Sequence, residues 1–122
     1  MRRSLSEVDF MGWPAIALEQ GPLTLHLTPA IGGRLMGITF DGEQLCFIHP
    51  ALRGKLPSDD AATWAALCGD WSFPLWGGGK TWLAPESAWP DGAPHRDLDS
   101  GAWSVVQSWF DDAGMGAELR SP

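Results

Sequence analysis

The sequence predicts an all-β protein: an antiparallel β-sandwich with one short helix and a long tryptophan-rich loop. Residues 23–28 (LTLHLT) alternate apolar and polar side chains, which is typical of a strand with one apolar face. Asp41-Gly42 stands between two apolar runs, where a tight hairpin turn needs residues that tolerate positive φ. Glycine and proline interrupt the chain at short intervals, so long helices are not expected.

Four or five antiparallel strands are expected before residue 50. The runs that carry strand patterns are 15–19 (AIALE), 22–29 (PLTLHLTP), 34–40 (RLMGITF) and 43–48 (EQLCFI). One helix is expected over residues 58–69 (SDDAATWAALCG), where Ser58 can cap the start and Gly69 can close the end. Its apolar stripe would cover a sheet edge.

Periodicity is lost between Trp71 and Trp103, a segment rich in proline, glycine and tryptophan. A long loop of this kind inside a domain is usually functional. Strand pattern returns at residues 102–110 (AWSVVQSWF), turns at DDAG, and resumes at 115–122 (MGAELRSP). Because this last strand is barely finished at Pro122, we expect residues 1–122 to form a single but incomplete domain.

Composition narrows the classes of function. A net charge of −7 disfavours a nucleic-acid partner, because phosphates would be repelled. No apolar run approaches the roughly 20 residues of a membrane-spanning helix, and no signal-peptide pattern follows Arg2 and Arg3, so a cytoplasmic location is expected. Cys46 and Cys68 lack a C-x-x-C spacing and are expected to be reduced and buried.

The segment GGGKT, residues 77–81, suggests a phosphate-binding loop, and the sequence itself argues against one. The pattern G-x-x-x-x-G-K-[ST] requires glycine at position 74, which is Pro74 here. A phosphate-binding loop also opens a helix, whereas Pro85 and Pro90 stop any long helix after Lys80.

Polar residues of the same region are candidates for binding a ligand. His95, Asp97 and Asp99 lie two apart, so on an extended segment they would point the same way, toward a metal or sugar hydroxyls. The calcium-loop pattern fails because Gly101 stands where the third ligand belongs, so no metal is expected. The competing interpretation is a solvated polar loop. Glu86 and Asp99 could act as an acid and base pair if the loop brought them together.

The tryptophans admit two interpretations. They could form a small local core under the loop, or their faces could receive the apolar side of a sugar ring while polar neighbours bind its hydroxyls. On the second interpretation the candidate substrate-binding residues are Arg34, Trp76, Lys80, Trp82, Glu86, His95, Asp97 and Asp99. No catalytic residue is assigned.

Two segments resemble the galactose-mutarotase-like proteins of the aldose 1-epimerase superfamily. TPAIGGRLMGITFDGEQLCFI, residues 28–48, is similar to their N-terminal hairpin, and GGGKTWLAPESAWP followed by DLDSGAWSV is similar to a loop of an uncharacterised subgroup. The resemblance spans most of residues 13–106. It transfers motif positions only: Gly32, Gly33, Arg34, Gly77, Gly78, Lys80, Trp82, Pro85, Asp99 and Gly101.

The resemblance implies a large β-sandwich with a carbohydrate ligand and cofactor-free sugar epimerisation by a histidine acid and a glutamate base. Those catalytic residues lie in later strands of the family, so none is carried over and this chain is not expected to be catalytically competent alone. An exposed strand edge could pair copies into a homo-oligomer. The alternative is a non-catalytic β-domain that binds a protein or glycan partner through the tryptophan-rich loop.

Overall fold

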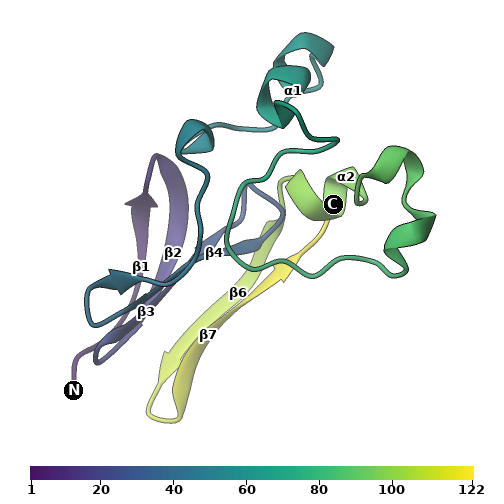
Figure 1. The fold of residues 1–122 in the computed structure, drawn as a ribbon. Helices are drawn as coiled ribbons and strands as arrows, with labels where there is room; N and C mark the ends of the chain where they lie inside the picture. Colours follow the sequence, from purple (N-terminus) through teal and green to yellow (C-terminus); the bar gives the residue numbers. More distant parts are fainter.

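The computed structural model describes residues 1–122, and it contains two antiparallel sheets (Figure 1). The predicted all-β fold is confirmed. The first sheet has the order β1-β2-β3-β4-β5, and the second pairs β6 with β7. The strands are β1 (Arg3–Phe10), β2 (Trp13–Gln20), β3 (Leu23–Thr28), β4 (Arg34–Phe40), β5 (Glu43–Gln44), β6 (Ser104–Asp111) and β7 (Gly114–Arg120).

Tight turns join the neighbouring strands of the first sheet. In the predicted turn, Asp41 and Gly42 have φ of 51° and 83°, and Phe40 pairs with Glu43 across them. The turn therefore sets the register of β4 and β5. The sequence prediction missed β1, and it made β5 too long: only Glu43 and Gln44 are in the strand, although Ile48 makes an isolated bridge further on.

The helices are short, and the structure has more of them than the sequence predicts. They are α1 (Ala61–Cys68), α2 (Arg96–Ser100) and the 3-10 helices η1 (Pro50–Leu52), η2 (Glu86–Ala88) and η3 (Pro90–Gly92). Helix α1 confirms the expected helix, but its cap is Asp60 rather than Ser58. The Asp60 carboxylate accepts the backbone N–H of Thr63 at 2.8 Å. None of these helices has the length and apolarity that crossing a membrane requires.

The core joins the first sheet to the tryptophan-rich segment. Trp13 of β2 and Trp76 of the long loop are both fully buried, and their rings meet edge to face at 6.4 Å. The other buried members of this cluster are Phe10, Ala15, Ile31, Met36, Ile48, Leu52 and Leu67. Trp76 is therefore part of the main core, which places the start of the loop against the sheet.

Residues 71–103 contain only short helices and isolated bridges, but they are closely tied to the sheet. Gly77 and Gly79 form isolated bridges with Ile48 and Leu35, so the glycine run lies between these two segments. Residues Arg96–Ser100 form α2, so the extended arrangement in which His95, Asp97 and Asp99 would point the same way is absent. The reason is local capping: His95 Nδ1 accepts the N–H of Leu98 at 3.4 Å, and the His95 carbonyl accepts the N–H of Asp99 at 2.9 Å.

Strands β6 and β7 form a hairpin that reaches away from the helices, as Figure 1 shows. It contacts the first sheet through β1, where the Arg3 guanidinium lies 4.8 Å from the centre of the Phe110 ring and donates to the Asp111 carbonyl at 2.8 Å. Trp109 and Phe110 are 44% and 49% exposed. All eight residues of β6 are exposed, whereas most of β7 is half-buried.

Candidate functional site

Arg34 is the centre of the candidate site. It begins β4 and is 5% exposed, so its guanidinium must find partners inside the protein. Nη1 donates to the Gly77 carbonyl at 2.8 Å, and Nη2 donates to both the carbonyl and the carboxylate Oδ1 of Asp99, at 2.9 and 2.8 Å. One side chain therefore connects β4, the glycine run and α2.

Asp99 is the anionic partner, and it is 1% exposed. Its Oδ1 also accepts the indole N–H of Trp82 at 2.7 Å, while Oδ2 accepts the Ser100 hydroxyl at 3.1 Å. The Trp76 indole in turn donates to Ser100 Oγ at 2.9 Å. Both carboxylate oxygens are thus engaged, and the network joins the core to the exposed loop.

Burial and charge act on Arg34 in opposite directions. Burial lowers the pKa of Arg34 below its ordinary value, and the nearby carboxylate and hydrogen bond of Asp99 raise it again. Arginine keeps its proton in proteins, so the guanidinium of Arg34 stays charged despite its burial. Removing either partner would leave an uncompensated charge in the interior, which typically costs about 3–5 kcal/mol.

Three glycines allow the backbone to pass close to this pair. A Cβ on Gly32 would lie 2.1 Å from the Asp99 carbonyl oxygen. On Gly77 and Gly78 it would lie 2.3 Å from the Phe47 carbonyl oxygen and 2.4 Å from the Leu35 carbonyl oxygen. Two of their amides also bond the neighbouring segments: the N–H of Gly32 donates to the Gly101 carbonyl at 2.7 Å, and the N–H of Gly78 donates to the Phe47 carbonyl at 2.9 Å. These glycines therefore fit the loop against the strands, and no helix begins at Lys80 to bind a phosphate, because residues 80–85 are not helical.

Lys80 lies at the edge of the same network. Its Nζ donates to the Gly32 carbonyl at 2.8 Å and lies 4.6 Å from the centre of the Trp103 ring. Burial lowers the pKa of Lys80, and the positive charge of Arg34 lowers it further, with Asp99 opposing. Lys80 thus holds the Gly32 turn, and its side chain is half-buried.

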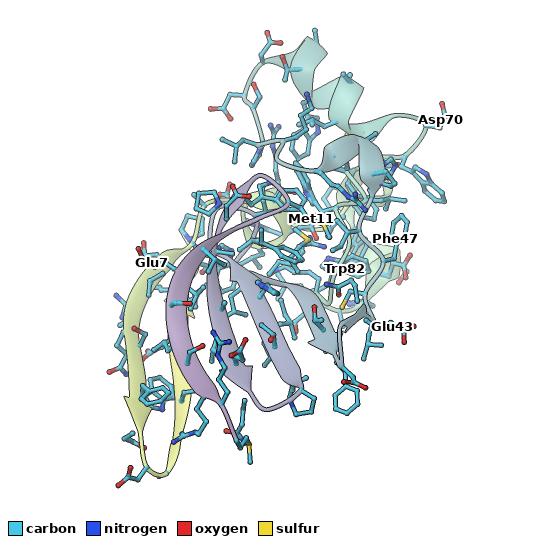
Figure 2. All side chains as sticks on the ribbon, turned by 90° about the vertical axis from the view of Figure 1, so that its left-hand side faces the viewer. Glu7, Met11, Glu43, Phe47, Asp70 and Trp82 are labelled. Atoms are coloured by element: carbon cyan, nitrogen blue, oxygen red, sulfur yellow. The ribbon has the colours of Figure 1, made fainter.

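A cavity of about 390 Å³ opens beside these residues. Trp82 is 44% exposed there, and its ring stands at 87° to Phe73 and 88° to Trp89, with centroids 5.8 and 5.1 Å away. Figure 2 shows Trp82 and Phe47 close together beside the five-stranded sheet. The lining includes Arg34, Phe47, Phe73, Trp76, Gly77, Lys80, Trp82 and Asp99.

The structure brings together five of the candidate binding residues, namely Arg34, Trp76, Lys80, Trp82 and Asp99. The other three lie elsewhere. Glu86 is exposed at the start of η2, and Asp97 is exposed in a separate hollow near Ser58. His95 caps α2 and lines a third hollow with Trp89. Glu86 is not among the residues that line the cavity with Asp99.

Sequence reasoning missed Phe47 and Phe73 as lining residues. Phe47 lies in an apolar run predicted as a strand, and Phe73 directly precedes Pro74, so neither stood out from the surrounding apolar residues. The bridge between Ile48 and Gly77 is what brings Phe47 to the cavity. A pairing between segments so far apart in the chain leaves no local signal.

Comparison of the chain with protein-family models, curated proteins and solved structures finds no match. The resemblance to galactose-mutarotase-like proteins therefore stays a prediction from motifs. Within residues 1–122, no group of three or more His, Cys, Asp or Glu side chains is placed to hold a metal ion.

We expect Gly32→Ala to destabilise the fold far more than Gly42→Ala. Both glycines have positive φ, of 64° and 83°, so each substitution introduces backbone strain of about 1–2 kcal/mol. Only the Cβ at position 32 would also collide with the backbone of Asp99, whereas nothing lies within 4 Å at position 42. Denaturant unfolding gives both free energies, and equal losses would contradict this role for Gly32.

Proposed function

We propose that the cavity beside Arg34 and Lys80 binds a carbohydrate, with Trp82 as the surface on which the sugar ring lies. The observation that carries this proposal is that Trp82 is half exposed and yet held in one orientation. Its indole N–H is bonded to Asp99 at 2.7 Å, and two aromatic rings stand perpendicular to it. A ring that is fixed before binding loses little conformational entropy when a ligand arrives.

The chemistry of the lining supports a ligand that is apolar on one face and polar at its edge. Trp82, Phe73 and Phe47 supply aromatic surface, and Lys80 supplies a donor at the rim. Ligand pockets commonly measure about 300–1,000 Å³ and combine apolar walls with few polar groups. A volume of about 390 Å³ is at the lower end of this range, which favours a small sugar.

Binding of a sugar does not imply that the protein epimerises it. Polarimetry would measure epimerisation separately. Opening a sugar ring needs a general acid and a general base near the anomeric centre. The ionisable groups of this lining are Arg34, Lys80 and Asp99, and both oxygens of the Asp99 carboxylate already accept hydrogen bonds. We therefore assign no acid or base to the cavity.

A second candidate function is binding of a protein or glycan chain through the exposed loop. Trp71, Leu83 and Phe47 are 63%, 58% and 65% exposed, and large exposed apolar side chains are a feature of interaction surfaces. Such a partner would contact the rim of the cavity rather than fill it. Failure of all monosaccharides to bind would favour this alternative.

We also propose that copies of the chain associate through an open strand edge. Strand β1 carries Arg3, Glu7 and Asp9, and charges protect an edge from pairing. Strand β7 pairs with β6 on one side only and has charges only at Glu118 and Arg120, so its edge is the better candidate. Sedimentation velocity should then show dimers at high protein concentration, and a monomer throughout would rule this out.

We expect Trp82→Ala to weaken binding of a monosaccharide about tenfold, because it removes the aromatic face. Titration of galactose and glucose, followed by protein-observed NMR, measures the affinity. Trp71→Ala is the matched control, since Trp71 is exposed and outside the cavity lining. Thermal unfolding of each variant separates lost binding from lost folding. Unchanged affinity in a folded Trp82→Ala protein would contradict the proposal.

A further inference from the structure

The charges that line the cavity do not cancel. Its ionisable side chains are the cations Arg34 and Lys80 and the single anion Asp99. With both bases protonated, the formal charge of the lining is +1. The 122 residues together carry a net charge of −7, so the cavity lining is positive within a negatively charged protein.

Asp99 neutralises Arg34 rather than Lys80. Its Oδ1 lies 2.8 Å from Arg34 Nη2, and this is one of the two ion pairs in the structure. The other joins Arg2 to Glu19. Lys80 thus has no carboxylate partner. Its ammonium group has three donors, of which one bonds the Gly32 carbonyl, while the Trp103 ring lies against the charge.

The environment of Lys80 indicates that positive charge there is uncompensated. Partial burial lowers the pKa of Lys80, and Arg34 lowers it further. An anionic group placed beside Lys80 would relieve both effects, because it would replace lost hydration and oppose the charge of Arg34. The guanidinium of Arg34 also has an unused hydrogen-bond donor, because its Nε is buried without a partner.

We propose that the sugar bound in this cavity carries one acidic group, a carboxylate or a phosphate, which binds the Lys80 ammonium while the ring lies on Trp82. This inference rests on the proposed sugar-binding function and narrows it to anionic sugars. A charge-assisted hydrogen bond is roughly twice as strong as a neutral one, so the acidic group would set specificity as well as affinity.

The test compares acidic and neutral sugars that share a ring. Galacturonate is titrated against galactose, and glucose 6-phosphate and glucuronate against glucose, by protein-observed NMR at low and high salt. We expect at least one acidic sugar to bind about tenfold more tightly than its neutral counterpart, as a charged hydrogen bond predicts. The preference should shrink at high salt. The uronate and phosphate arms show which acidic group is preferred.

Lys80→Met should abolish the preference for the acidic sugar while retaining weak binding of the neutral one. The control is Lys55→Met, which removes the other lysine of the chain at an exposed position outside the cavity. Lys55→Met should keep the full preference. If Lys80→Met does not fold, the ratio of affinities in the unmodified protein and its loss with salt still decide the question.

Two results would overturn this inference in distinguishable ways. Equal affinity for acidic and neutral sugars would refute the anionic ligand and leave sugar binding intact. An unchanged preference in folded Lys80→Met would likewise remove Lys80 from the recognition of the acid. Binding of no sugar at all would instead overturn the proposed function itself.

Discussion

The buried ion pair between Arg34 and Asp99 is the interaction on which the loop region depends. Taking two charges out of water is costly, and it is offset only when each group has several partners. Arg34 donates hydrogen bonds to Gly77 and Asp99. The Asp99 carboxylate additionally accepts hydrogen bonds from Trp82 and Ser100. The pair thereby fixes the positions of α2, the glycine run and β4 relative to one another. The loop itself contains only short helices, so it depends on such side-chain bonds.

This arrangement explains why the same segments carry structure and candidate function. Gly32, Gly77 and Gly78 are small because the backbone of another segment occupies the space of their side chains. Lys80 and Trp82 use one polar atom each to hold the network, and both side chains also line the cavity. The glycines before Lys80 therefore serve close packing of the backbone, and the candidate binding groups are the side chains of Lys80 and Trp82.

Local patterns predicted every strand except β1, made β5 too long, and predicted the site only in part. Alternation gave β3, the Asp-Gly pair gave the β4–β5 turn, and Gly69 gave the end of α1, because each depends on neighbouring residues. Arg34 and Asp99 are separated by 65 positions, so their pairing follows from the tertiary fold and leaves no local trace. The extended arrangement considered for His95, Asp97 and Asp99 is absent for a local reason, since His95 caps a short helix instead.

A double-mutant cycle on the ion pair tests this account most directly. The free energy of unfolding would be measured for Arg34→Met, Asp99→Leu and the double variant. If the pair organises the loop, each single change costs about 3–5 kcal/mol and the double variant costs little more than either one, which gives a coupling energy close to the cost of one single change, about 3 kcal/mol or more. Additive losses, with a coupling energy near zero, would show that the two side chains act independently and would contradict the central role of the pair.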